Sequence, residues 1–205
     1  DLDTLVDDLA TVVEDVSAHG GGGATVVGHS FGGQVAFGLA ARRPELVDRL
    51  VLVGSNGVRA SRSEEFPFGA PASAVLPGLL ADEHSDRIAS RRRTLASAFA
   101  GSPSEDLLAW LLATSLRMPT WAATACYRSM LTADLVADVG KVRQPVAQVV
   151  GSKDPMFSIK GARWLADALP DSRLVALEGC GHYPMFEAPD AFESALLDFV
   201  GAGAK

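Results

Sequence analysis

One serine lies between glycines at the point where an apolar run ends. Ser30 is the third residue of GHSFG (28–32), which follows the apolar run 24–27 and precedes a helix-like stretch over 33–42. This pattern predicts a sharp strand-to-helix turn that exposes the serine Oγ, with no room for a Cβ at Gly28 or Gly32. A serine hydroxyl attacks poorly at neutral pH unless a base is delivered to it, so a histidine and a carboxylate are needed elsewhere.

Two downstream loops contain these groups. Asp154 follows the apolar run 145–150, and His182 follows the run 173–177. In a parallel sheet the loops after the strands gather at one edge, so Ser30, Asp154 and His182 are expected to converge there. The order serine, aspartate, histidine along the chain differs from the orders of chymotrypsin-like and subtilisin-like proteases.

These motifs resemble those of cap-bearing serine hydrolases of the α/β-hydrolase superfamily. The resemblance is carried by GHSFGG (28–33), GSKD (151–154) and GCGHYPMFE (179–187). It spans nearly the whole chain and is weakest over about 58–139. A lone Gly-x-Ser-x-Gly would be weak evidence, whereas all three motifs in order, each after a predicted strand, form a specific signal.

The resemblance implies a role for each group. Ser30 would attack an ester-like carbonyl, His182 would act as the base, and Asp154 would orient His182. The backbone N–H of Phe31 would be one donor of an oxyanion hole. The implied activity is hydrolysis of a carboxylic ester through an acyl-enzyme intermediate.

The pattern of apolar residues predicts the α/β fold that would hold these groups. A helical stripe covers 2–16, and strands are expected over 24–28, 50–54, 146–150 and 173–177, with helices over 33–42, 159–169 and 190–200. Alternating strands and helices indicate a parallel sheet flanked by helices. We expect a partial α/β-hydrolase core over 1–56 and 140–205, truncated to about four strands. The insertion 57–139 is expected to be a cap, with a loop first and helices over 82–100, 104–117 and 120–131.

The family's usual sheet has eight strands, and its nucleophile follows the fifth. Here Ser30 follows the first predicted strand, so the chain is interpreted as either a piece of a longer protein or a minimal hydrolase. The family's second oxyanion donor, from the loop after the third strand, has no counterpart. The strand at 24–27 would be an apolar edge, and we expect either that a second chain or a symmetry mate covers it or that the missing segment of the sheet exists.

Apolar residues near the predicted site suggest its substrate. Phe31, Trp121, Met156, Phe157 and Tyr183 are expected to line a pocket for a small apolar acyl or aryl ester. Lactone hydrolysis, carbon–carbon bond hydrolysis and cofactor-free perhydrolysis on the same groups stay open. So does a different class, a non-catalytic binding protein or an incomplete remnant. A basic run at 91–93 is interpreted as a solvated helix face in preference to an anion clamp.

Composition restricts the remaining function classes. Lys and Arg number 18 and Asp and Glu 25, so the net charge of −7 argues against nucleic acid as a partner. No apolar stretch of about 18 residues occurs, so no membrane span is expected. No secretory signal is visible, and we expect a cytoplasmic protein. No metal or other cofactor is expected, because the histidines are not paired at ligand spacing and no Cys-x-x-Cys occurs.

Overall fold

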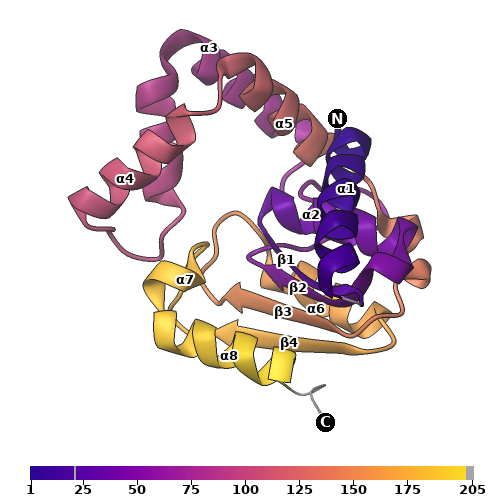
Figure 1. Cartoon of the computed structure of the whole chain (residues 1–205). Helices are drawn as coiled ribbons and strands as arrows, with labels where there is room; N and C mark the ends of the chain where they lie inside the picture. The colour runs from indigo at the N-terminus through magenta and orange to yellow at the C-terminus, as the bar shows by residue number, and fades with distance from the viewer. Residues whose placement is uncertain (21, 202–205) are drawn as a thin grey trace.

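A parallel β-sheet forms the centre of the molecule (Figure 1). The computed structural model describes residues 1–20 and 22–201. Its strands are β1 (Ala24–His29), β2 (Val47–Val53), β3 (Val146–Gly151) and β4 (Ser172–Leu177), in the spatial order β1-β2-β3-β4. All neighbouring pairs are parallel, so every strand ends at the same edge of the sheet. This confirms the predicted α/β fold with a sheet of four strands.

Helices cover both faces of this sheet. The helices α1 (Leu2–Gly20), α2 (Phe31–Arg42) and α6 (Ile159–Ala168) share one core cluster, and α8 (Pro189–Gly201) contributes to a second. The alternation of side chains along β2 sets the division: Leu50 and Leu52 belong to the first cluster, and Val51 and Val53 to the second. Short helical turns complete the core at η1 (Pro44–Leu46), η2 (Val136–Lys141) and α7 (Pro184–Glu187).

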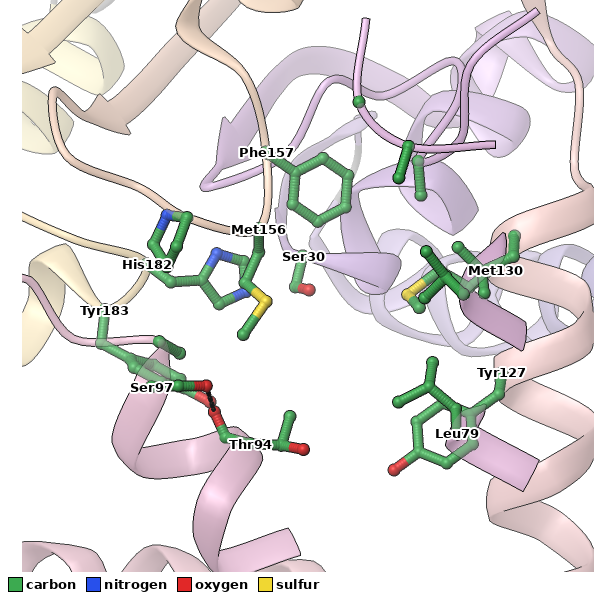
Figure 2. A pocket seen from close by; sticks show the side chains of 17 residues that line it. Ser30, Leu79, Thr94, Ser97, Tyr127, Met130, Met156, Phe157, His182 and Tyr183 are labelled. Carbon is green, nitrogen blue, oxygen red and sulfur yellow. Dashed lines mark hydrogen bonds between the residues drawn. The ribbon is translucent and has the colours of Figure 1, made fainter. Parts of the chain in front are cut away.

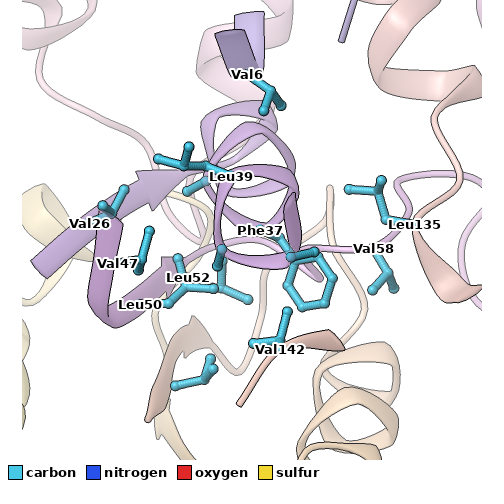
Figure 3. Packing of buried hydrophobic residues seen from close by; sticks show 14 of the residues in the cluster. Val6, Val26, Phe37, Leu39, Val47, Leu50, Leu52, Val58, Leu135 and Val142 are labelled. Atoms are coloured by element: carbon cyan, nitrogen blue, oxygen red, sulfur yellow. The ribbon is translucent and has the colours of Figure 1, made fainter. Parts of the chain in front are cut away.

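Phe37 of α2 is central to the larger cluster. Its ring is fully buried, with Leu52, Val58 and Val142 close by in the same cluster (Figure 3). Leu135 lies in the same cluster, as do Phe66 and Val139. Both ends of the insertion predicted as a cap therefore pack in the main core. The part that stands off the carboxyl edge of the sheet consists of three helices, α3 (Ala72–Ser97), α4 (Glu105–Leu116) and α5 (Thr120–Thr132).

The first cap helix differs from the prediction. It begins at Ala72, ten residues before the expected start, and contains Pro77. Proline removes one backbone donor and normally ends a helical pattern, which is why this stretch was expected to be a loop. The interruption lies instead at Asp86, where φ is −154° and ψ is 81°.

The second strand also begins earlier than expected, at Val47. Asp48 and Arg49 are polar, so the continuous apolar run begins only at Leu50, but this end of the strand pairs with the edge strand β1, where Thr25 is in register with Arg49. Among the described residues β1 pairs with β2 alone, and Val27 on it is 48% exposed. Coverage of this edge by a second chain stays a prediction. No helix in the described part of the chain has the length and apolar character needed to cross a membrane.

Candidate active site

The turn after β1 holds Ser30 in an unusual backbone conformation. Its φ is 54° and its ψ is −123°, and it is the one non-glycine residue with positive φ in the described part of the chain. The Ser30 N–H donates to the carbonyl of Val53 at 2.9 Å, which ties the turn to the end of the neighbouring strand. A strained residue of this kind persists only where its surroundings enforce it, and such residues concentrate at functional sites.

Two glycines enforce the turn. One of them is Gly28, as expected, but the other is Gly33 and not Gly32. A Cβ on Gly28 would lie 2.4 Å from the carbonyl oxygen of Gly32, and one on Gly33 would lie 2.4 Å from Ser55 Oγ. A Cβ on Gly32 would meet nothing within 4 Å. The expected collision at Gly32 is therefore absent, because the second close approach is between Gly33 on α2 and the loop after β2.

Asp154 and His182 meet at the same edge of the sheet. His182 Nδ1 and Asp154 Oδ2 are 2.9 Å apart, and the two side chains are 6% and 1% exposed. The other oxygen of Asp154 accepts from the backbone N–H groups of Met156 at 2.7 Å and Phe157 at 3.0 Å. An ionised carboxylate only accepts, so Nδ1 of His182 is the protonated nitrogen and Nε2 is left as the base.

Aromatic rings enclose the imidazole of His182. The Phe157 ring stacks on it with centroids 5.7 Å apart, and Tyr183 meets it edge-on at 5.3 Å. On another side the ring of His29 lies 4.8 Å away. His29 Nε2 is 2.9 Å from the carbonyl oxygen of His182, which only an Nε2–H can satisfy as donor. Burial, and then the nearby imidazole of His182, lowers the pKa of His29 and favours this neutral form.

Glu187, for which the sequence suggested no role of its own, connects the cap to the loop of His182. Its Oε2 accepts from Ala100 N at 2.8 Å and Gly181 N at 3.0 Å, and its Oε1 accepts from Tyr183 N at 3.1 Å. The N–H of His182 itself donates to the carbonyl of Ala98 at 2.9 Å. The loop that carries His182 is therefore connected to the turn after α3 directly, through the Ala98 carbonyl, and indirectly, through the carboxylate of Glu187. The only available sequence signal was the carboxylate in the motif over 179–187.

A cavity of about 460 Å³ lies between the cap and this edge of the sheet. Ser30 and His182 both line it, and Figure 2 shows them beside each other with Met156 and Phe157 close by. Tyr183 lines it on the His182 side. The opposite wall includes Leu79, Tyr127 and Met130, none of which was expected from the sequence to line the pocket.

The other expected lining residues lie elsewhere. Phe31 lines a second, smaller cavity next to the first. Trp121 is 76% exposed at the start of α5 and lines neither cavity. Its apolar character suggested a pocket residue, but the inner face of α5 is formed by Ala123, Tyr127 and Met130. An indole on the outer face cannot touch a substrate in either cavity.

The basic run at 91–93 also differs from the expected solvated face. Arg91 is only 5% exposed and forms a buried ion pair with Glu83. Arg92 is half-buried and pairs with Glu105, and Arg93 is exposed and pairs with Asp82. One residue of the run is thus structural, because α3 bends at Asp86 and brings Glu83 back against Arg91.

Cys180 lies beside the site without the features of a reactive thiol. It is buried, and burial followed by the charges of Glu187 and Asp154 raises its pKa to about 11. A protonated thiol is a poor nucleophile and a poor metal ligand. Across residues 1–20 and 22–201, no cluster of three or more His, Cys, Asp or Glu side chains could hold a metal ion.

Comparisons with known proteins place the chain in a family. Residues 1–195 match the model of the alpha/beta hydrolase family. Pimeloyl-[acyl-carrier protein] methyl ester esterase from Aromatoleum aromaticum is 34% identical over 185 residues, 86% of this chain and 74% of that relative. The enzyme of the same name from Nitrosomonas europaea is 34% identical over 198 residues, 95% of this chain and 78% of that relative.

The same fold occurs in solved structures. The esterase EaEST from Exiguobacterium antarcticum superposes with a TM-score of 0.91 at 21% identity, over 98% of this chain and 74% of that one. The bromoperoxidase from Bacillus anthracis does so with a TM-score of 0.90, also at 21% identity and over the same shares of the two chains. The chain therefore belongs to the alpha/beta hydrolase family of enzymes.

Proposed function

We propose that this protein is a serine hydrolase that cleaves carboxylic esters with Ser30, His182 and Asp154. The observation that carries the proposal is the convergence of two features on one cavity: a strained serine turn and a histidine whose Nδ1 is bonded to a buried carboxylate. The relatives at 34% identity are named as methyl ester esterases, which supports an ester as the substrate.

In this mechanism His182 Nε2 removes the Ser30 proton as Oγ attacks the ester carbonyl. The carbonyl carbon becomes tetrahedral, and its oxygen gains the negative charge. Phe31 is the first residue of α2, so its N–H has no partner within the helix and is available to donate to that oxygen. Asp154 holds the protonated His182 in place and stabilises its charge.

The second half of the reaction uses the same groups. His182 gives its proton to the leaving alkoxide, which departs as an alcohol and leaves an acyl group on Ser30. Water then attacks the acyl-enzyme while His182 accepts a water proton, and the carboxylic acid is released. The rings of Phe157 and Tyr183 beside His182 limit the access of other water molecules.

Fluorophosphonate labelling with peptide mapping tests the nucleophile directly. We expect the label on Ser30 in the wild-type protein and no label in Ser30→Ala, with kcat for a small ester lower by about 10⁶-fold. Ser97→Ala is the matched control, because Ser97 lines the same cavity while its hydroxyl donates to the Thr94 carbonyl. This variant should keep the label on Ser30.

A folded wild-type protein without a label would contradict the catalytic proposal and favour a binding protein. A label on Ser30 without turnover of esters would contradict ester hydrolysis. A panel of lactones and carbon–carbon bond substrates, with a peracid assay, would then identify which related reaction the same groups perform.

A further inference from the structure

A second cavity adjoins the one that contains Ser30. Its volume is about 290 Å³, and its lining includes Phe31, Leu95, Met118, Ala123 and Cys126. Thr94, Tyr127 and Met130 line both cavities, so the side chains of these residues are what separates the two spaces. Methionine is unbranched and flexible, which makes Met130 an adaptable partition.

The mechanism decides which part of an ester could enter this space. The leaving oxygen must lie close to His182 Nε2, because His182 supplies its proton. The leaving group therefore lies on the side of His182 and Tyr183, and the acyl group extends away from them. Figure 2 shows Tyr127 and Met130 across the cavity from His182 and Tyr183, with Ser30 between. The second cavity is thus on the acyl side.

The position of Phe31 agrees with this direction. Phe31 follows the nucleophile directly in the chain, and it lines the second cavity but not the first. An acyl chain whose carbonyl oxygen is bound at the Phe31 N–H would therefore begin beside a residue that lines the second cavity. The route from the reacting carbonyl to the second cavity is therefore short.

The residues that line the second cavity also indicate whether the end of a bound acyl chain is charged or uncharged. Most of the lining side chains are apolar, and the charged one, Arg91, is already paired. Arg91 Nε donates to Glu83 at 2.9 Å, one terminal nitrogen also bonds to Glu83, and the other donates to the carbonyl of Ser115. With its charge balanced by a buried carboxylate, this cavity offers no free cation to a carboxylate at the end of a substrate.

We propose that the second cavity binds the distal part of an uncharged, medium-length acyl chain, so that Phe31, Ala123, Cys126 and Met130 determine acyl specificity. This inference rests on the proposed ester hydrolysis and assigns the substrate class of that site. The enzyme should prefer p-nitrophenyl octanoate to p-nitrophenyl acetate. It should also prefer methyl octanoate to monomethyl suberate, which has the same length but ends in a carboxylate.

Filling the second cavity tests the proposal. Ala123 is 3% exposed and lines the cavity, so Ala123→Phe places a ring in it. We expect kcat/KM for the octanoate ester to fall at least 10-fold, and kcat/KM for the acetate ester to change less than 2-fold. The matched control is Ala125→Phe on the exposed face of the same helix, which should change neither value. Cys126→Leu is a smaller filling substitution that serves if Ala123→Phe does not fold.

The outcomes separate this inference from the function on which it rests. Equal losses for both esters, or no loss for either, in a folded filled variant would overturn the acyl-site assignment and leave ester hydrolysis standing. Preference of the wild type for monomethyl suberate would overturn the requirement for an uncharged chain end. A wild-type protein that hydrolyses neither ester would contradict ester hydrolysis and the acyl site together.

Discussion

The carboxyl edge of the sheet and the cap hold their functional residues in different ways. At the sheet edge backbone segments approach one another closely, and buried carboxylates bond to them: a Cβ on Gly151 would lie 2.1 Å from the carbonyl oxygen of Gly181, and Asp154 accepts from two backbone N–H groups. In the cap, side chains make the contacts, and large apolar groups such as Trp110 and Trp121 are 56% and 76% exposed. The sheet edge with Ser30, Asp154 and His182 is therefore more tightly packed than the outer faces of the cap helices.

The cap contains a buried ion pair between Glu83 and Arg91. The two residues lie on either side of the bend at Asp86, and they are 2% and 5% exposed. Arg91 also bonds to the end of α4 through the Ser115 carbonyl, and Arg87 donates to the Leu116 carbonyl at 2.9 Å. Burial opposes ionisation of Glu83, but the hydrogen bonds and charge of Arg91 lower its pKa below the usual value.

Breaking this pair should produce the largest effect on stability. Glu83→Gln leaves the guanidinium of Arg91 buried without its counter-charge, and we expect the free energy of unfolding to fall by about 3–5 kcal/mol. Urea unfolding followed by circular dichroism measures the change. Glu105→Gln breaks the exposed pair with Arg92 and should cost at most about 1 kcal/mol. Equal losses in the two variants would show that the cap does not depend on its buried pair.

The sequence predicted the sheet edge better than the cap, for a physical reason. The positions of Ser30, Asp154 and His182 follow from short motifs at the ends of strands, and parallel strands all end at one edge. The buried strands are continuous apolar runs, so their existence was clear from the sequence.

The cap depends on contacts that no local pattern encodes. The bend at Asp86 and the pairing of Glu83 with Arg91 are tertiary, and Pro77 lies inside a helix against its propensity. Trp121 and Tyr127 are both aromatic residues of one helix, and only its packing places one outside and the other in the cavity. Exposure of a helix face in an open cap cannot be derived from hydropathy alone.

Glu187 links the two regions, and its substitution should have an intermediate effect. We expect Glu187→Ala to lower kcat about 10-fold with little change in KM, because the loop of His182 loses two backbone bonds to this carboxylate and the cap turn loses a third, from Ala100. Glu187→Gln retains an acceptor oxygen and should restore part of the loss. A lower kcat at unchanged KM, in a variant that unfolds at the same urea concentration as the wild type, would separate positioning of His182 from simple destabilisation.

The matched control for this prediction is Glu193→Ala on the exposed face of α8. It removes the same charge from the same part of the chain without touching the His182 loop, so kcat should stay within about 2-fold of the wild type. Unchanged kcat in Glu187→Ala would show that the cap turn after α3 and the His182 loop are positioned independently.

The smallest predicted effect concerns His29, whose pKa is lowered by burial and by His182. The ionisable groups around it are His182, with ring centroids 4.8 Å away, Tyr183 at 5.4 Å, and Asp154. The folded state holds His29 neutral at pH values where the unfolded chain binds a proton. The contribution of neutral His29 to the free energy of unfolding is therefore fully present above the pKa of histidine in the unfolded chain, about 6.5. It is lost as the pH falls through the lower pKa of His29 in the folded protein.

His29→Gln removes this titration while an amide N–H can still donate to the His182 carbonyl. The slope of unfolding free energy against pH, measured by urea unfolding between pH 7 and pH 5, should decrease by at most about 1.4 kcal/mol per pH unit. His84→Gln on the exposed surface of α3 should leave the slope unchanged. If both variants kept the wild-type slope, the acid sensitivity would have to reside in groups other than His29. In that case the contacts around His29 at the sheet edge would accommodate a charged imidazole, contrary to what the burial of His29 indicates.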